Sequence, residues 1–266
     1  MALSPMVMGV VNVTPDSFFP ASRTLTAHDA MARGRAHFLA GCDIVDVGGE
    51  STRPGASGVG VDQEIDRVLD VVAALVREGP VSVDTQKEAV ARAAVHAGAT
   101  VINDVSSTLA EVAGELGVGY VGMHRQGVSA TMQDSPTYVD VVREVSGFLE
   151  TVAQRARAAN VTQLWLDPGI GFGKTTEHNL ALLAHLDQLV AVARQYGAGV
   201  LIGTSRKRFL GELGREKLDV DQRFEGSLAT AAWAMLQGVS MVRVHDAVAA
   251  VQLRELLERP VQEVVA

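Results

Sequence analysis

The sequence predicts an α/β fold, a single-domain (β/α)8 TIM barrel that spans residues 1–266 and holds its ligand site at the C-terminal ends of the strands. Three observations support it. Short apolar runs rich in Val and Ile recur along the chain, segments of helical period separate them, and no linker or charge block interrupts the alternation. A doubly wound open sheet is the competing architecture.

The candidate strands are eight short apolar runs. Their residues are apolar on successive positions and do not alternate, which is typical of parallel strands covered on both faces. In chain order the runs are 7–11, 44–47, 81–83, 100–102, 120–123, 164–166, 200–202 and 241–244.

The segments between these runs are the candidate helices. Apolar stripes at helical spacing cover 65–76 and 90–97. Signals for helix ends support them, because capping boxes favour helix starts and glycine favours the left-handed residue that ends a helix. The signals are the pairs Thr85–Glu88 and Thr108–Glu111 and the glycines Gly79, Gly98 and Gly117.

Composition narrows the class of ligand. The 23 basic and 31 acidic side chains give a net charge of −8, and the basic residues form no run, which disfavours a partner nucleic acid or an anionic membrane. No stretch of 18 apolar residues occurs, and Met1 to Val13 lacks the basic flank of a signal peptide. A lone Cys42 excludes a disulfide framework. We therefore expect a soluble, cytoplasmic protein with small-molecule ligands.

Three long polar connections mark one rim of the barrel. The stretches 12–26, 48–62 and 123–138 each follow a strand, and long ordered loops are usually functional. A polar group also ends every predicted strand, although Asp84, Ser205 and Asp246 could instead simply cap helices. The rim residues are Asn12, Asp46 with 48–50, Asp84, Asn103, Asp104, His124, Asp167, 205–207, Arg243 and His245.

The rim residues divide by charge. Cations gather late in the chain, at 204–207 and 243–245, where barrels often bind phosphate and where a helix starting near Ser205 would add free backbone N–H groups. These cations could instead pair with acids of the rim. Asp84, Asn103 and Asp167 offer acceptors for the N–H groups of a flat heterocycle. A Mg²⁺ ion held by one or two such oxygens and a substrate phosphate is a competing use.

The glycine-rich segment 167–175 fails the phosphate-loop template because residue 168 is Pro. Its glycines would permit close backbone approach to a ligand, with Phe172 and Lys174 projecting from the loop. Nucleophile elbows and zinc-protease motifs are absent from the sequence.

Taken together, the motifs resemble those of the dihydropteroate synthases, enzymes of folate synthesis, over nearly the whole chain. The matching segments are 12–18, 48–55, 83–85, 102–106, 123–124, 167–174, 205–207 and 243–245. The resemblance implies one pterin-binding barrel domain that joins 6-hydroxymethyl-7,8-dihydropterin diphosphate to 4-aminobenzoate, releasing pyrophosphate and giving 7,8-dihydropteroate. It also implies Mg²⁺ as cofactor and a homodimer.

The resemblance assigns roles to individual residues. Asp84, Asp167, Lys207, Arg243 and His245 would be the catalytic residues. The residues that would hold the pterin are Asp84, Asn103, Asp167 and Lys207, with Met123, Phe172 and Gly203 lining its slot. Asn12, Arg243 and His245 would bind the diphosphate, and Asn12 would also bind Mg²⁺. The aminobenzoate would be bound by Phe18, Thr52, Arg53, Pro54, Ser205 and Lys207.

Two departures from the family pattern stand out. Residues 19–22 read Phe-Pro-Ala-Ser in place of the usual Ser-Asp-Gly-Gly, which would stiffen the first loop, and Ser107 stands where Gly is common. A pterin-dependent methyltransferase and a non-catalytic pterin-binding paralogue are the alternative functions. The segments 205–207 and 243–245, which suit a diphosphate, favour the synthase over the methyltransferase, and the presence of Asn12, Arg243 and His245 favours it over the paralogue.

Overall fold

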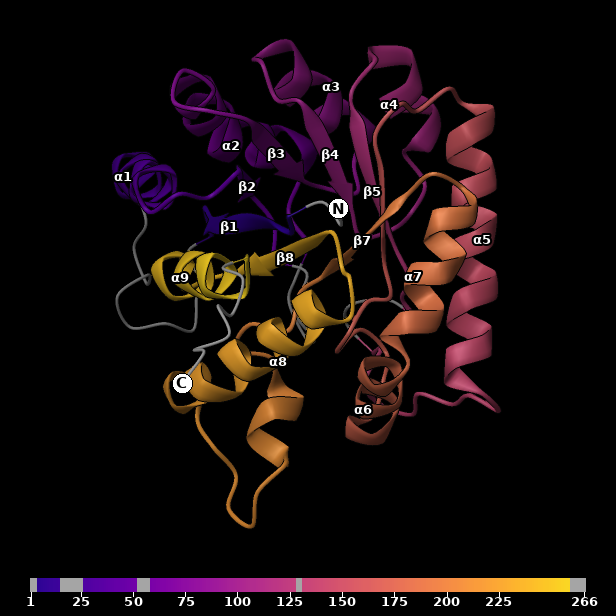
Figure 1. Cartoon of the computed structure of the whole chain (residues 1–266). Helices are drawn as coiled ribbons and strands as arrows, with labels where there is room; N and C mark the ends of the chain where they lie inside the picture. The colour runs from indigo at the N-terminus through magenta and orange to yellow at the C-terminus, as the bar shows by residue number, and fades with distance from the viewer. Residues whose placement is uncertain (1–3, 15–25, 52–57, 128–130, 259–266) are drawn as a thin grey trace, which may run out of the picture.

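The computed structural model describes residues 4–14, 26–51, 58–127 and 131–258. Within them eight parallel strands close into a barrel in the order β1 to β8, which confirms the predicted architecture. Helices lie outside the strands: in Figure 1, α2 to α4 cover one side, α5 and α7 a second, and α8 and α9 a third.

The eight strands all fall on the predicted apolar runs. Their bounds are β1 Met6–Asn12, β2 Ile44–Gly48, β3 Val81–Asp84, β4 Val101–Asp104, β5 Gly119–Met123, β6 Leu164–Asp167, β7 Gly199–Ile202 and β8 Met241–Val244. The helices are α1 Ala27–Leu39, α2 Val61–Leu75, α3 Glu88–His96, α4 Ala110–Leu116, α5 Val141–Ala158, α6 Thr176–Ala184, α7 Leu186–Gln195, α8 Phe224–Leu236 and α9 Ala247–Glu258, with 3-10 turns η2 Arg208–Glu212 and η3 Val220–Arg223.

The inside of the barrel is filled by a small apolar layer. Because side chains on a strand alternate between faces, the residue two positions after each layer residue points to the same side, one step nearer the mouth. That step leads from Ile44 to Asp46, from Val101 to Asn103 and from Met241 to Arg243. The layer consists of Met8, Ile44, Val101, Val121, Leu201 and Met241.

A larger core packs the outer faces of the strands against the helices. Cys42 is buried within it. Two of the three predicted terminal glycines are confirmed, since Gly98 and Gly117 have φ of 110° and 66° just after α3 and at the end of α4. Gly79 does not take a left-handed conformation. It lies against Phe38, whose ring leaves no room for a Cβ atom.

Both predicted capping boxes are wrong, because buried carboxylates accept the hydrogen bonds of groups at and beside the two threonines. Helix α3 begins after Lys87, and the Thr85 hydroxyl instead donates to Glu64 at 2.6 Å. Before α4 the backbone N–H groups of Thr108 and Leu109 donate to Asp104, at 2.6 and 2.8 Å. Asp104 is fully buried and points away from the mouth, so its role is to build this turn.

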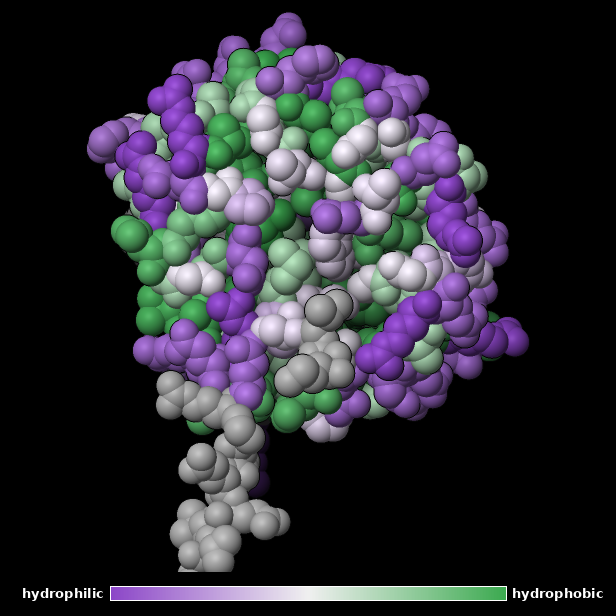
Figure 2. Space-filling model, turned by 45° about the horizontal axis from the view of Figure 1, so that its top comes forward, coloured by the Kyte–Doolittle hydropathy of each residue, from purple (hydrophilic) through white to green (hydrophobic). Residues whose placement is uncertain are grey.

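The face shown in Figure 2 intersperses hydrophilic and hydrophobic residues across its breadth. None of the helices in the described segments has the length and apolar character that crossing a membrane requires.

Candidate functional site

Arg243 organises the side of the mouth built by β2, β3, β4 and β8, called the arginine side below. Its Nε donates to Asp46 Oδ2 at 2.7 Å and its Nη2 donates to Asp84 Oδ2 at 2.8 Å. Asn103 Nδ2 donates to the same Asp46 oxygen at 3.0 Å. The expectation that these residues gather at one rim is therefore met, and the alternative in which rim cations pair with rim acids also describes Arg243 in this structure.

The Arg243 guanidinium forms ion pairs with two carboxylates, and these charges change the pKa values of the groups. Burial raises the pKa of Asp84 to about 7; Arg243 opposes that change, while the charges of Asp46, Glu64 and Asp104 add to it. The pKa of Arg243 is raised above its usual value: burial works against this, and Asp46 and Asp84 outweigh it. Asp84 can therefore hold or release a proton near neutral pH, whereas Arg243 stays charged.

Asp46 was expected at the rim but was given no binding or catalytic role. Its side chain is fully buried, and its Oδ1 has no hydrogen-bond partner among the described residues. An unpaired buried oxygen of this kind is costly and is typical of functional sites. The signal was available: Asp46 is a charged residue inside the apolar run 44–47, which simple core packing does not explain.

Lys207 and Asp167 dominate the opposite side of the mouth, built by β5, β6 and β7 and called the lysine side below. The Lys207 ammonium donates to the carbonyl of Ile170 and lies 4.6 Å from the centre of the Phe172 ring. Burial lowers the pKa of Lys207 to about 8, with the Asp167 charge opposing this change. Burial likewise raises the pKa of Asp167, against the charge of Lys207.

Lys174 is the second buried lysine of this side. Its Nζ lies 2.9 Å from His124 Nδ1 and 2.9 Å from the carbonyl oxygen of Gly169, and it is 3% exposed. Burial lowers the pKa of Lys174 to about 7 and that of His124 to about 3, so the imidazole is neutral and accepts from the lysine. The prediction that Lys174 projects from its loop is therefore wrong.

The expectation for the 167–175 segment was that its glycines allow a ligand to approach the backbone; in the structure Gly169 and Gly173 instead bring two loops together, and Gly171 lies against the Lys207 side chain. Gly169 and Gly173 have φ of 66° and 61°, and a Cβ atom on either would collide with the backbone carbonyl of His124 or Gln126. Asp167 Oδ1 accepts the Gly169 N–H at 2.7 Å, which fixes this carboxylate at the mouth. Close approach is needed between the loops that follow β5 and β6.

The anion side of the predicted site lies at the ends of β1 and β8. Ser205 Oγ accepts the backbone N–H of His245 at 3.2 Å and lies 3.1 Å from its ring Nδ1. Asn12 Oδ1 and Asp84 Oδ2 both flank Gly48, 3.7 and 3.6 Å from where its Cβ would be. The sequence predicted a helix starting near Ser205, but no α-helix starts there. The first helical turn after it is η2, which begins at Arg208.

The second loop is anchored at its base by Glu50, which is 9% exposed. Glu50 Oε2 accepts the Val59 N–H at 2.7 Å and the Lys87 ammonium at 2.5 Å. Lys87 also contacts Glu64. Glu50 therefore ties residues on both sides of 52–57 to the start of α3.

Several predicted residues have simpler placements. Met123 is buried at the end of β5, and Phe172 lies under the Lys207 ammonium. Gly203 leaves space between Arg243 and Lys207, since a Cβ there would lie 3.7 and 3.8 Å from their nearest atoms. Phe18, Thr52, Arg53 and Pro54 lie outside the described residues.

The described residues at the mouth could hold a magnesium ion only together with a substrate phosphate. Among the residues that the structure describes, no group of three or more His, Cys, Asp and Glu side chains could hold a metal. Asn12 offers one carboxamide oxygen at the anion side of the mouth. Mg²⁺ commonly takes one or two protein oxygens together with water and substrate phosphate, so this site fits an ion delivered with a diphosphate.

Comparison with known proteins gives a consistent result. The model of the family "Pterin binding enzyme" matches residues 8–245. The dihydropteroate synthase of Escherichia coli (strain K12) is 41% identical over 262 residues, covering 96% of this chain and 91% of the relative. That of Mycobacterium leprae is 43% identical, covering 94% and 92%.

Solved structures agree with this result. A Yersinia pestis dihydropteroate synthase, solved with a sulfonamide drug, superposes with a TM-score of 0.89 at 40% identity, covering 96% of this chain and 94% of that one. The Xanthomonas albilineans enzyme in complex with 7,8-dihydropteroate gives a TM-score of 0.82 at 39% identity, covering 97% and 94%. The chain therefore belongs to the pterin-binding enzymes and, within them, to the dihydropteroate synthase family.

Proposed function

We propose that the chain catalyses the dihydropteroate synthase reaction, joining 6-hydroxymethyl-7,8-dihydropterin diphosphate to 4-aminobenzoate with release of pyrophosphate. The observation that carries this proposal is the mouth itself, where Asp84, Asn103 and Asp167 face the same opening as Arg243 and Lys207. The family membership of the chain supports it.

The acidic and amide side chains suit the pterin ring. Asp84 and Asp167 each accept one hydrogen bond within the protein, from Arg243 and from the Gly169 N–H, so each carboxylate can accept further donors. The amino and ring N–H groups of a pterin would supply those donors. Met123, Phe172 and Gly203 would line the slot: Met123 is buried at the end of β5, Phe172 lies under the Lys207 ammonium, and Gly203 leaves space between Arg243 and Lys207.

Arg243 and His245 would act on the diphosphate. As the C–O bond breaks, negative charge moves onto the leaving pyrophosphate and positive charge onto the pterin methylene. Arg243 stays charged at all relevant pH values and presents a planar fork suited to phosphate oxygens. Its present partners Asp46 and Asp84 hold that fork at the mouth, and Asp84 and Asp167 would stabilise the electron-poor ring.

Asn12 would hold Mg²⁺ through its carboxamide oxygen, with the diphosphate completing the coordination. When bound, the ion would supply positive charge that favours the leaving pyrophosphate.

The aminobenzoate would bind on the outer part of the lysine side. Ser205 and Lys207 are the described residues of this predicted subsite, and Phe18, Thr52, Arg53 and Pro54 complete it. The Xanthomonas albilineans and Thermus thermophilus relatives were solved with 4-aminobenzoate. In this chain the Glu50 anchor would fix the base of the loop that carries Thr52 to Pro54.

The test is pyrophosphate release from the pterin diphosphate by the full chain. We expect release that requires both 4-aminobenzoate and Mg²⁺. Binding of the pterin diphosphate without any release, with both supplied, would contradict the proposal and indicate a pterin-binding paralogue. Methyl transfer from a methylated pterin would indicate the methyltransferase instead.

We further propose that the chain forms a homodimer through α6 and α8. Leu180 on α6 and Trp233 and Leu236 on α8 are 42%, 45% and 65% exposed. The Trp233 indole donates to the carbonyl of Leu183 at 2.8 Å, so the two helices present these apolar side chains together. Contiguous apolar surface of this kind is typical of interfaces. Sedimentation should show a dimer, and Leu236→Lys should give a monomer.

We also place the protein in the cytoplasm. Its single cysteine is buried and has no second cysteine to pair with, as is usual in a reducing compartment. Cell fractionation tests this; recovery with the periplasmic or secreted fraction would contradict it.

A further inference from the structure

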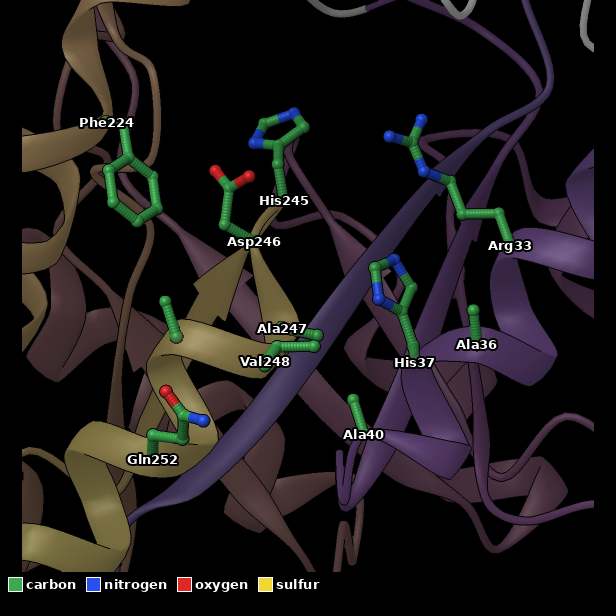
Figure 3. A pocket seen from close by; sticks show the side chains of 11 residues that line it. Arg33, Ala36, His37, Ala40, Phe224, His245, Asp246, Ala247, Val248 and Gln252 are labelled. Carbon is green, nitrogen blue, oxygen red and sulfur yellow. The ribbon is translucent and has the colours of Figure 1, made fainter.

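A cavity of about 430 Å³ lies beside the anion side of the mouth, between α1 and α9. Figure 3 shows Arg33 and His37 reaching into it from α1, opposite His245 and Asp246 from the turn after β8. The alanines Ala36 and Ala40 and the side chain of Val248 form its apolar part. The cavity lies outside the barrel interior, so it is separate from the slot proposed for the pterin.

Arg33 is the group in this cavity that calls for a ligand. Within the described residues its guanidinium makes no hydrogen bond and no ion pair. Burial lowers the pKa of Arg33, the like charge of Arg206 lowers it further, and Asp246 opposes both. A half-buried guanidinium facing another one is costly unless an anion lies between or beside them.

The neighbouring acid does not fill that role, because it is already held. Arg206 binds Asp246 through two hydrogen bonds, Nη2 to Oδ1 at 2.6 Å and Nε to Oδ2 at 3.1 Å. That pairing balances Asp246 against Arg206 and leaves the charge of Arg33 in excess. His37 cannot balance that charge, because an imidazole is neutral or cationic; its Nε2 lies 3.1 Å from the carbonyl oxygen of Val10, and burial lowers its pKa.

We propose that this cavity is a second anion site that takes pyrophosphate as it leaves the active site, with Arg33 as its main donor. The inference rests on the proposed function, which makes pyrophosphate the second product. His245 connects the two sites, because it belongs to the predicted diphosphate subsite and also lines the cavity. Released pyrophosphate would thus pass from Arg243 and His245 to His245 and Arg33.

The experiment is calorimetric titration of the full chain with pyrophosphate alone. We expect two molecules bound per chain, and one in Arg33→Ala. The matched control is Arg35→Ala, which removes an exposed arginine of the same helix that pairs with Glu78, and which should still bind two. Ala36→Phe, which fills the cavity and keeps Arg33, should also bind one and guards against a folding defect in Arg33→Ala.

Kinetics give a second measurement. Both substrate KM values should stay at the parent values in Arg33→Ala, and pyrophosphate should still inhibit it at the active site, because Arg33 belongs to neither substrate subsite. Two pyrophosphates bound by both Arg33→Ala and Ala36→Phe would overturn the inference, as would a parent chain that binds only one. Binding of benzoate in place of pyrophosphate at the Arg33 site would overturn it in favour of an organic carboxylate site.

Failure of this inference is distinguishable from failure of the proposed function. An active enzyme that binds one pyrophosphate refutes the second site alone. An inactive chain that binds two, one of them dependent on Arg33, refutes the proposed reaction and leaves the anion site in place.

Discussion

The two sides of the mouth hold their cations by different means. On the arginine side Arg243 contacts two carboxylates directly, at 2.7 and 2.8 Å. On the lysine side Lys207 and Lys174 donate to neutral acceptors, the carbonyls of Ile170 and Gly169 and the ring of His124. The charges therefore lie in contact on one side and are separated on the other.

This difference sets what each side can do as pH changes. A guanidinium keeps its charge near neutral pH, so the arginine side offers a permanent cation for an anion. A buried ammonium loses its proton more easily, and burial lowers the pKa of Lys174 to about 7 and that of Lys207 to about 8. On the lysine side, therefore, the cations themselves gain or lose protons near neutral pH.

Replacing Arg243 tests the contact pairs and should have the largest effect. We expect Arg243→Ala to lower kcat by roughly 10²-fold or more, by analogy with the loss of one preorganised donor. It should also cost about 3–5 kcal/mol of unfolding free energy, because Asp46 and Asp84 are left buried without their cation. Steady-state kinetics and denaturant unfolding measure the two effects.

The control for Arg243 is Arg254→Ala, which removes another ion-paired arginine, on α9 beside Asp43. We expect it to leave kcat near the parent value. Equal losses of kcat in the two variants would mean that Arg243 matters only for stability.

Lys174 tests the separated charges through pH. Its folded pKa of about 7 is below the ordinary value of 10.5, so between these values the unfolded chain binds more protons. Stability from this group therefore increases as pH rises from about 7 to 10.5, by an amount on the order of a few kcal/mol. Lys174→Met should remove that increase from a series of unfolding measurements, whereas the exposed Lys217→Met should keep it.

Glu50 tests the anchor of the second loop and should give a smaller effect. Glu50→Gln weakens the contact with Lys87 and one acceptor of the Val59 N–H, so we expect a loss of about 1–2 kcal/mol and a raised KM for 4-aminobenzoate with little change for the pterin. Glu88→Gln, in an exposed pair with Arg92, should change neither. Equal KM changes for both substrates would argue against a loop anchor.

The barrel could be predicted from the sequence because buried parallel strands appear as continuous apolar runs, which can be recognised without knowing the structure. The rim residues followed from the strand ends. Asp46 was counted among the rim residues but given no role, because that role depends on contact with Arg243, 197 positions away, which local pattern does not encode. The Thr85 capping box failed for the same reason, because Glu64, 21 positions away, accepts the Thr85 hydroxyl. At Thr108 the competing carboxylate is local, since Asp104 lies only four positions away.

The glycine loop gives a similar lesson. Its spacing correctly indicated close approach, but the partner of Gly169 and Gly173 is the loop after β5 and not a ligand. A sequence shows that a Cβ is absent, and only the fold shows which neighbour uses the space.

Ser107 supplies the smallest test, where the two sides of the mouth meet at β4 and β5. Its φ of 56° favours glycine and costs a serine roughly 1 kcal/mol or more, while its hydroxyl donates to the Met123 carbonyl at 2.9 Å. That hydrogen bond is worth about 1 kcal/mol and offsets the strain. Ser107→Gly loses both contributions and should change stability little, whereas Ser107→Ala keeps the strain without the bond and should be about 1 kcal/mol less stable than Ser107→Gly. If unfolding showed the two variants to be equally stable, the backbone at 107 would carry no strain, and the serine at this position would be explained by its hydrogen bond alone.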